Sequence, residues 1–278
     1  MTPDMNELEA TARTALACLD LTSLADGHDV AGGEAEIEAL CAKAIGARGG
    51  EAAAFGASGR GATAAVCVWP RLAAFARARL PAHIAVAAVA NFPEGGSDIE
   101  RAVRDTRAIV DAGAQEVDVV LPYRDLAAAP ALLAAVRRAC DGLVLKVILE
   151  TGEMADAATI DAACRMALDA GADFLKTSTG KKPISATPAA AERLLAAIVT
   201  HEAGDAAARS RVGFKPAGGI RTVADAAVYI GLTAQALGAG AVNPRRFRIG
   251  ASGLLADIEA VLEGTHRHEP GPGPGTSY

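Results

Sequence analysis

The sequence lacks the features that mark several broad classes of protein. In its 278 residues, no apolar stretch approaches the roughly 20 residues that a membrane-spanning helix needs. The segment Met1 to Glu9 is polar and acidic, unlike a secretory signal peptide. The net charge of -6 offers no broad basic surface for nucleic acid. We therefore expect a cytoplasmic protein that binds neither membranes nor nucleic acid.

Motifs for metals, disulfides and dinucleotides are also missing. The chain has no HExxH segment and no early GxGxxG turn, so a zinc protease site and a dinucleotide-binding domain are disfavoured. His266 and His268 lie close together, but their Pro/Gly-rich surroundings favour solvated side chains over metal ligands. The cysteines are odd in number, scattered and without CxxC spacing, which indicates neither a disulfide framework nor a thiolate metal site: Cys18, Cys41, Cys67, Cys140 and Cys164.

Short β-type runs alternate with longer alanine-rich helical segments along a chain that is 51% hydrophobic. Eight such alternations favour an α/β fold with one (β/α)8 TIM barrel over an open doubly wound sheet. We expect the barrel to span residues 1–264 and a flexible Gly/Pro-rich tail to span 265–278. The predicted strands are Ala17 to Leu21, Ala64 to Val68, Ile84 to Val89, Glu116 to Leu121, Leu143 to Glu150, Phe174 to Thr177, Val212 to Lys215 and Arg248 to Ala251.

Helix boundaries can be predicted from short local signals. Ser97 followed by Glu100 reads as a capping box, and that helix should end near Gly113. Thr187 before Pro188 marks another helix start. The motif Asp-Ala-Gly-Ala occurs before the strands at Glu116 and Phe174, an internal echo that supports a repeating βα unit. Gly46 to Gly61 should form a long loop before the second strand.

Two lysines end strand-like runs, Lys176 in FLKTSTG and Lys215 in VGFKPAGGI. Apolar walls and a second cation both favour the neutral amine, so Lys176 could act as a nucleophile with Lys215 as its neighbour. The alternative is that both are ordinary lysines whose stems lie along the strand ends. Asp118 and Lys146 lie inside apolar strands, where a charge is costly unless paired, so they form either a structural ion pair or part of a site. Cys67 reads as a small core residue rather than a nucleophile.

Glycine turns follow the last two predicted strands, where barrels commonly bind phosphate through backbone amides and a helix N-terminus. Gly180 and Lys181, after the sixth strand, could add an amide and a cation. The alternative is that these glycines only make tight turns. The phosphate-binding candidates after strands seven and eight are Gly218, Gly219, Arg221, Gly250, Ser252 and Gly253.

Taken together, these segments resemble the deoxyribose-phosphate aldolases, a family of class I aldolases. The blocks occur in the family's order and span nearly the whole chain, which makes them specific as a set. One departure is Ser252-Gly253, where many members have paired serines. The matching blocks are DLTSL (20–24), AAVCVWPR (64–71), EVDVVLPYR (116–124), LKVILETGE (145–153), GADFLKTSTGK (171–181), GFKPAGGIRT (213–222) and RIGASGLL (248–255).

The resemblance implies reversible cleavage of 2-deoxy-D-ribose 5-phosphate to D-glyceraldehyde 3-phosphate and acetaldehyde, in deoxyribonucleoside catabolism, without metal or organic cofactor. It implies that Lys176 forms the Schiff base, that Lys215 lowers its pKa, and that Asp118 relays protons. It further implies that Tyr278, at the end of the tail, assists protonation of the enamine, and that the protein forms a homodimer. Besides the glycine turns, Gly180 and Lys181, the implied substrate-binding set comprises Asp20, Thr22, Cys67, Lys146 and Thr177.

Two other functions remain open on the residues alone. A sugar-phosphate isomerase on the same barrel would share the phosphate turns but would need no imine-forming lysine. A non-catalytic sugar-phosphate-binding protein could keep Gly218, Gly219 and Ser252 without turnover. A metal-dependent aldolase is less favoured, because the predicted strand ends lack a histidine cluster.

Overall fold

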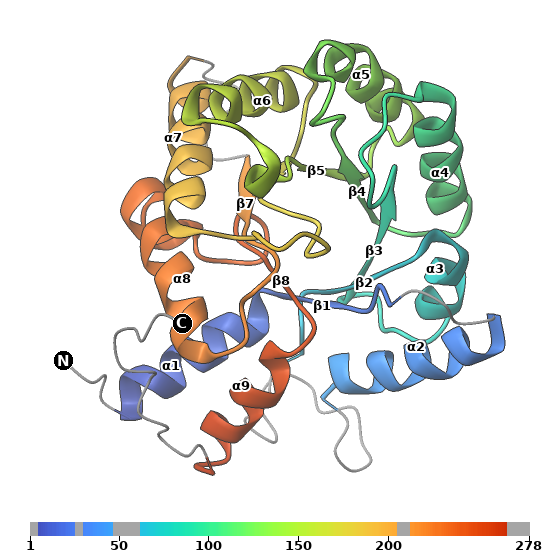
Figure 1. Cartoon of the computed structure of the whole chain (residues 1–278). Coiled ribbons are helices and arrows are strands. Elements are labelled where there is room, and N and C mark those ends of the chain that lie inside the picture. The colour runs from blue at the N-terminus through green and yellow to red at the C-terminus, as the bar shows by residue number, and fades with distance from the viewer. Residues whose placement is uncertain (1–4, 26–29, 47–61, 205–211, 266–278) are drawn as a thin grey trace, which may run out of the picture.

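The computed structural model describes residues 5–25, 30–46, 62–204 and 212–265. Within them the chain forms a (β/α)8 barrel, confirming the predicted fold class (Figure 1). The elements are α1 (Met5–Ala17), β1 (Leu19–Thr22), α2 (Val30–Ala44), β2 (Ala65–Val68), α3 (Pro70–Arg77), β3 (Ala85–Ala90), α4 (Ile99–Asp111), β4 (Glu116–Val120), η1 (Leu126–Ala128), α5 (Ala129–Ala139), β5 (Val144–Ile148), η2 (Thr151–Glu153), α6 (Ala157–Asp169), β6 (Phe174–Lys176), α7 (Pro188–Gly204), β7 (Gly213–Lys215), α8 (Val223–Leu237), η3 (Ala239–Ala241), β8 (Ile249–Ala251) and α9 (Leu254–Leu262).

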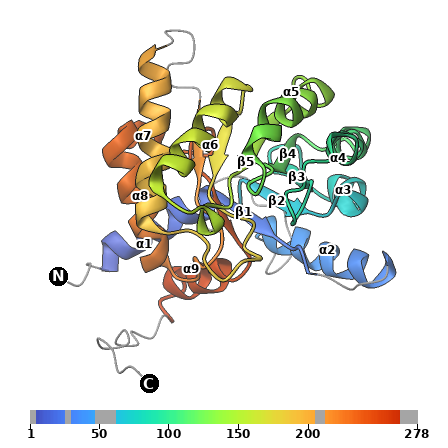
Figure 2. The ribbon, with the colours of Figure 1, turned by 45° about the horizontal axis from the view of Figure 1, so that its top comes forward.

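The strands are all parallel and lie in the order β7-β6-β5-β4-β3-β2-β1-β8. The ring closes between β7 and β8 through two parallel bridges, Phe214 with Phe247 and Ala217 with Gly250. Helices surround the strands, and α1, which precedes the first strand, packs against α8 and α9 (Figures 1 and 2). The carboxyl ends of all eight strands therefore meet at one end of the barrel, where such folds place their chemistry.

The strands read as apolar runs because both of their faces are covered. Every residue of β2, β4, β6, β7 and β8 is buried. One face packs against the surrounding helices and the other fills the barrel interior, as expected for a parallel sheet. The helices show the matching period: α4 buries Ala102, Thr106 and Ile109, which lie on one helical face. No helix in the described ranges is long and apolar enough to cross a bilayer.

All eight predicted strands are present, and each overlaps its predicted range. The helix start at Thr187 is also confirmed, because the Thr187 hydroxyl accepts a hydrogen bond from the Ala190 amide at 3.2 Å. Gly113 adopts a left-handed φ of 73° just after α4, so that helix ends where predicted. Positions 47–61 of the predicted loop and 266–278 of the predicted tail lie outside the described residues.

The predicted capping box at Ser97 and Glu100 is wrong. The residue that caps α4 is Asp98, whose carboxylate accepts a hydrogen bond from the Arg101 amide at 3.0 Å. Asp98 has the extended backbone of an N-cap and a charged acceptor that favours the positive end of the helix. It therefore displaces the start of the helix by one residue from the position that Ser97 would have given.

The repeated Asp-Ala-Gly-Ala motif lies beside a repeated set of arginine contacts at the amino ends of the strands, which we call the arginine clamp. Arg137, at the end of α5, donates to the carbonyls of Cys140 and Leu143 at 2.6 and 2.7 Å and pairs with Asp173 at 3.0 Å. Asp173 in turn accepts the Leu145 amide at 2.8 Å. This clamp ties the end of a helix to the starts of the next two strands.

Its counterpart uses an amide in place of the carboxylate. Arg77, at the end of α3, donates to the Leu80 and Ile84 carbonyls at 2.5 and 3.0 Å and to the Gln115 side chain at 2.9 Å. Gln115 also accepts the Val86 amide at 2.9 Å. The two clamps therefore occupy equivalent places in successive βαβα units.

Replacing Arg137 by Lys should lower the free energy of unfolding by about 1–3 kcal/mol, because an ammonium group cannot reach both carbonyls and the carboxylate in one fixed fork. Urea denaturation measures the loss. Arg138→Lys, at the adjacent exposed position, is the matched control and should change stability by less than about 0.5 kcal/mol. Equal effects of the two substitutions would contradict the clamp.

Candidate active site

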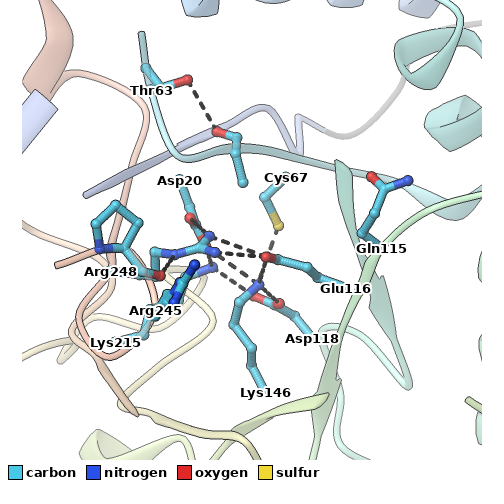
Figure 3. Close-up of polar contacts among 12 residues, drawn as sticks. Asp20, Thr63, Cys67, Gln115, Glu116, Asp118, Lys146, Lys215, Arg245 and Arg248 are labelled. Carbon is cyan, nitrogen blue, oxygen red and sulfur yellow. Dashed lines mark hydrogen bonds and ion pairs between the residues drawn. The ribbon is translucent and has the colours of Figure 1, made fainter. Parts of the chain in front are cut away.

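Five strands deliver charged side chains into the barrel interior. Asp118 on β4 lies beside Lys146 on β5, and Lys176 on β6 lies beside Lys215 on β7, in the register of the sheet. Asp20 enters from β1. All five residues are buried, with exposed fractions of 0 to 3%. The structure brings these five residues into one hydrogen-bonded group (Figure 3 shows Asp20, Asp118, Lys146 and Lys215).

Asp118 is the shared acceptor of the three lysines. Its Oδ1 accepts from Lys146 Nζ at 2.7 Å, and its Oδ2 accepts from Lys176 Nζ and from Lys215 Nζ, each at 2.8 Å. Two ammonium groups on one oxygen repel each other, so this geometry favours the loss of a proton from one of them. Asp118 and Lys146 thus form the ion pair that was one of the two alternatives, and Asp118 also touches the candidate nucleophile.

A second layer of charge lies below this group, nearer the amino ends of the strands. Arg248, just before β8, donates to Asp20 at 2.6 Å and to Glu116 at 2.7 Å. Asp20 also accepts from Lys215 at 2.5 Å, and Glu116 pairs with Lys146 at 2.6 Å (Figure 3). Arg248 and Glu116 therefore hold the carboxylates and lysines of the upper layer in place.

Sequence reasoning missed Glu116 and Arg248 as members of the site. The signal for Glu116 was present, since side chains two apart on a strand share a face, and Asp118 already pointed inward. Arg248 carries no comparable signal. It reaches Asp20 and Glu116 across the barrel, a contact that depends on the closed ring.

The cluster has four basic side chains and three carboxylates, so with every group ionised it carries one excess positive charge. Within the described residues Lys146 contacts three of the carboxylates, Lys215 two and Lys176 one. An uncompensated charge in a buried site is costly, and the least-paired amine is the one that relieves it by losing its proton. The seven members are Lys146, Lys176, Lys215, Arg248, Asp20, Glu116 and Asp118.

The directions of the pKa shifts of Lys176 and Lys215 agree with the number of carboxylates that each lysine contacts. Burial lowers the pKa of Lys176, and repulsion from Lys215 adds to the effect, so that together they outweigh the attraction of Asp118. Burial also disfavours the charged form of Lys215, but Asp118 and Asp20 overcome it and raise the Lys215 pKa. Although burial opposes ionisation of Asp118, its three lysines hold the pKa of this carboxyl well below the usual value. Lys176 is therefore the amine of this group that is poised to be neutral.

A cavity of about 740 Å³ opens at the carboxyl ends of β1, β6, β7 and β8, and α2 forms one side of it. Of the three clustered lysines, Lys176 alone is among the residues found to line it. The predicted site residues that line this cavity are Thr22, Lys176, Gly180, Lys181, Gly218, Gly219, Arg221, Gly250, Ser252 and Gly253. The others are buried and are not among the residues that line it: Asp20, Cys67, Asp118, Lys146, Thr177 and Lys215.

Four members of the implied substrate-binding set are thus not among the residues that line the cavity: Asp20, Cys67, Lys146 and Thr177. All four are 0% exposed. The Cys67 sulfur lies 4.0 Å from Asp118, and burial together with that carboxylate raises the pKa of the thiol. Cys67 is a buried, protonated core residue, as its sequence context suggested. Tyr278 lies outside the described residues.

The glycine turns also line the cavity. Gly218 and Gly219 have φ values of 85° and 82°, a backbone that favours glycine. A Cβ on Gly218 would lie 2.6 Å from the Ser185 hydroxyl and 3.0 Å from the Gly180 Cα, so the turns after β6 and β7 pack in direct contact. The exposed cations Lys181 and Arg221 flank these turns.

Helix α9 presents its N-terminus to the same cavity. Gly253 is its N-cap and supplies no side-chain acceptor. By contrast, the first amides of α8 are already used, since Asp225 accepts the amides of Arg221 and Thr222 and Asp257 accepts that of Val223. Of the two helices, α9 is therefore the one suited to hold an anion.

The difference in pairing makes a prediction about stability. Lys146→Met should lower the free energy of unfolding by about 3–5 kcal/mol, because Lys146 contacts all three buried carboxylates. Lys176→Met should change it by less than about 1 kcal/mol, because Lys176 contacts Asp118, which keeps Lys146 and Lys215 as partners. Urea titration of both variants tests the difference, and equal losses would contradict the unequal pairing of the two lysines.

Comparisons with known proteins identify the family of the chain. A model of the DeoC/LacD family aldolases matches residues 14–257. Among solved structures, a protein from Toxoplasma gondii ME49 that is provisionally named a deoxyribose-phosphate aldolase superposes with a TM-score of 0.80 at 24% identity, covering 95% of this chain and 98% of that one. A protein of the same provisional name from Coccidioides immitis gives 0.69 at 25% identity, with coverage of 93% and 88%. The deoxyribose phosphate aldolase of Aeropyrum pernix gives 0.68 at 21% identity, with coverage of 93% and 98%. At 21 and 24% identity a likeness establishes shared fold alone, but the family match covers most of the sequence, and the chain belongs to the DeoC/LacD family of aldolases.

Proposed function

We propose that this aldolase works through a Schiff base on Lys176 and reversibly cleaves 2-deoxy-D-ribose 5-phosphate to D-glyceraldehyde 3-phosphate and acetaldehyde. One observation carries the proposal. The amine whose pKa is lowered is also the amine that reaches the cavity, and it lies 2.8 Å from a carboxylate able to move protons.

The proposed reaction begins with attack of the neutral Lys176 amine on the C1 aldehyde of the open-chain sugar. The Asp118 carboxylate takes a proton from the nitrogen of the first adduct and returns it to the oxygen, which gives the neutral carbinolamine. A further proton from solvent lets the hydroxyl leave as water, and a protonated imine remains. A base then takes the proton of the C3 hydroxyl, and the C2–C3 bond breaks with its electrons entering the imine. C3 leaves as the aldehyde carbon of glyceraldehyde 3-phosphate, and the enamine stays on Lys176.

Completion of the cycle requires a proton on C2 of the enamine, followed by hydrolysis to acetaldehyde and the free amine. Tyr278 is our proposed donor for C2. Each step uses amine, carboxylate or hydroxyl chemistry, so the proposed mechanism requires neither a metal nor an organic cofactor. The net charge of the buried cluster is unchanged when Lys176 passes from neutral amine to neutral carbinolamine, whereas the imine adds one positive charge beside Asp118.

The choice of a phosphorylated substrate rests on four features of the cavity lining. They are the glycine turns after β6 and β7, the N-terminus of α9 and the cations Lys181 and Arg221. Backbone amides and a helix N-terminus of this kind suit a phosphate group. The proteins of similar structure are named for a deoxyribose phosphate substrate, which supports this particular sugar.

Borohydride reduction in the presence of acetaldehyde should place a reduced ethyl adduct on Lys176 and on no other lysine, as read by peptide mass mapping. Lys176→Ala should abolish both the adduct and turnover while keeping phosphate binding. Lys182→Ala, on the same loop, is the control and should trap as well as the unaltered protein. Turnover without an adduct would favour a sugar-phosphate isomerase, and ligand binding without turnover a binding protein.

Lys215→Leu should move the acid limb of the kcat/KM profile to higher pH. The loss of Lys215 removes repulsion from Lys176 and leaves Asp118 shared by fewer cations, so the pKa of Lys176 rises and less neutral amine exists near pH 7. At a pH below this pKa, raising the pKa by about one lowers the fraction of neutral amine, and hence the rate, about tenfold. Activity at alkaline pH should recover to within a few-fold of the unaltered protein, which separates this effect from misfolding. A profile that falls equally at every pH would contradict the role of Lys215.

A further inference from the structure

Glu150 is a buried acid that the proposed mechanism does not use. It follows the end of β5, is 0% exposed, and has a left-handed φ of 57°. Non-glycine residues adopt this conformation at a cost, and they cluster where the surrounding structure requires a particular direction for the side chain. The position of Glu150 is therefore maintained by its contacts rather than by local backbone preference.

Those contacts lead to the turn after β6. The Oε2 atom of Glu150 accepts from the Thr179 hydroxyl at 2.5 Å, and its Oε1 accepts from the Thr179 amide at 3.2 Å. The same hydroxyl accepts from the Lys181 amide at 3.0 Å. The hydrogen bonds thus form a relay from Lys181 through Thr179 to Glu150, and Gly180 lies at its centre with a φ of 78°.

The relay fixes one wall of the cavity. Thr179, Gly180 and Lys181 all line it, together with Lys176 and residues of α2. The Thr151 amide adds a bond to the Thr177 carbonyl at 3.0 Å. Through this bond and the bidentate contact, the segment after β5 determines the path of the segment after β6.

The same segment also contacts the far end of the loop. A Cβ on Gly152 would lie 2.2 Å from the Ile184 carbonyl oxygen, so the two backbones touch. The turn at 179–181 is thereby held from both sides. Its Gly180 also packs against Gly218, in the glycine turn after β7. Loss of the Glu150 carboxylate would release the turn without disturbing the lysine cluster, whose carboxylates are Asp20, Glu116 and Asp118.

We propose that Glu150 is a positioning residue for the phosphate end of the substrate, acting through Thr179 to hold the Gly180–Lys181 turn in its anion-binding conformation. This inference rests on the proposed function and assigns chemistry and phosphate affinity to different groups of residues. The Asp118 cluster controls the chemistry at C1, and the Glu150 relay controls affinity for the phosphate group.

The test compares 2-deoxyribose 5-phosphate with unphosphorylated 2-deoxyribose. Glu150→Gln and Thr179→Val should each raise KM for the phosphorylated sugar about tenfold, with kcat changed by less than about threefold, because each breaks one charge-assisted bond of the relay. Neither should change kcat/KM for 2-deoxyribose by more than about twofold. Thr179→Ser keeps the hydroxyl and should restore the KM of the unaltered protein.

Glu153→Gln is the matched control, since it removes the same charge from the same turn at a side chain that is 33% exposed. It should behave like the unaltered protein. Equal losses for both sugars, or a Thr179→Ser variant as impaired as Thr179→Val, would overturn the inference in favour of a purely structural role.

Two further measurements separate this inference from the proposed function. Trapping of acetaldehyde on Lys176 needs no phosphate, so it should be unchanged in Glu150→Gln; its absence in the unaltered protein would defeat the proposed function alone. Inorganic phosphate binding, measured by calorimetry, should weaken about tenfold in Glu150→Gln whatever the reaction. Unchanged phosphate binding would overturn the role of Glu150 alone.

Discussion

The interaction on which the site depends is the carboxylate of Asp118 accepting hydrogen bonds from three lysines inside a closed barrel. A single carboxylate cannot neutralise three ammonium groups, and the interior provides little water to share the charge. Asp20 and Glu116 are the other two carboxylates of the cluster, and Arg248, which pairs with both, is its fourth basic group. Three carboxylates thus face four basic groups. The site therefore carries one basic group more than it can stabilise in the charged form.

The positions of the three lysines in the barrel determine which of them loses its proton most readily. Lys146 and Lys215 lie deep and contact several carboxylates, whereas Lys176 contacts Asp118 and reaches the cavity. The amine whose pKa is lowered is consequently also the one that a substrate carbonyl can approach. Reactivity and access coincide because the same strand register that pairs Lys176 with Lys215 places the former at the carboxyl end of β6.

Much of this arrangement could be predicted from the sequence, and the reasons for the failures are physical. Apolar runs identified all eight strands because both faces of the sheet are covered, and charges inside those runs pointed to Asp118, Lys146, Lys176 and Lys215. The Arg248 contacts were not predictable, since they join residues brought together by ring closure. The N-cap at Asp98 was missed because Ser97 and Asp98 are adjacent and either side chain can cap a helix. The conformation of Glu150 follows from tertiary contacts with Thr179, which local sequence does not encode.

The ionisation of Lys176 can be measured directly, by trace acetylation of the native protein across pH with peptide mass mapping. The charge imbalance predicts that Lys176 reacts with a midpoint below the usual lysine value of about 10.4, while Lys146 and Lys215 stay unreactive at the same pH. A midpoint for Lys176 at or above that value, or earlier labelling of Lys215, would contradict the claim that the charge imbalance is relieved at Lys176.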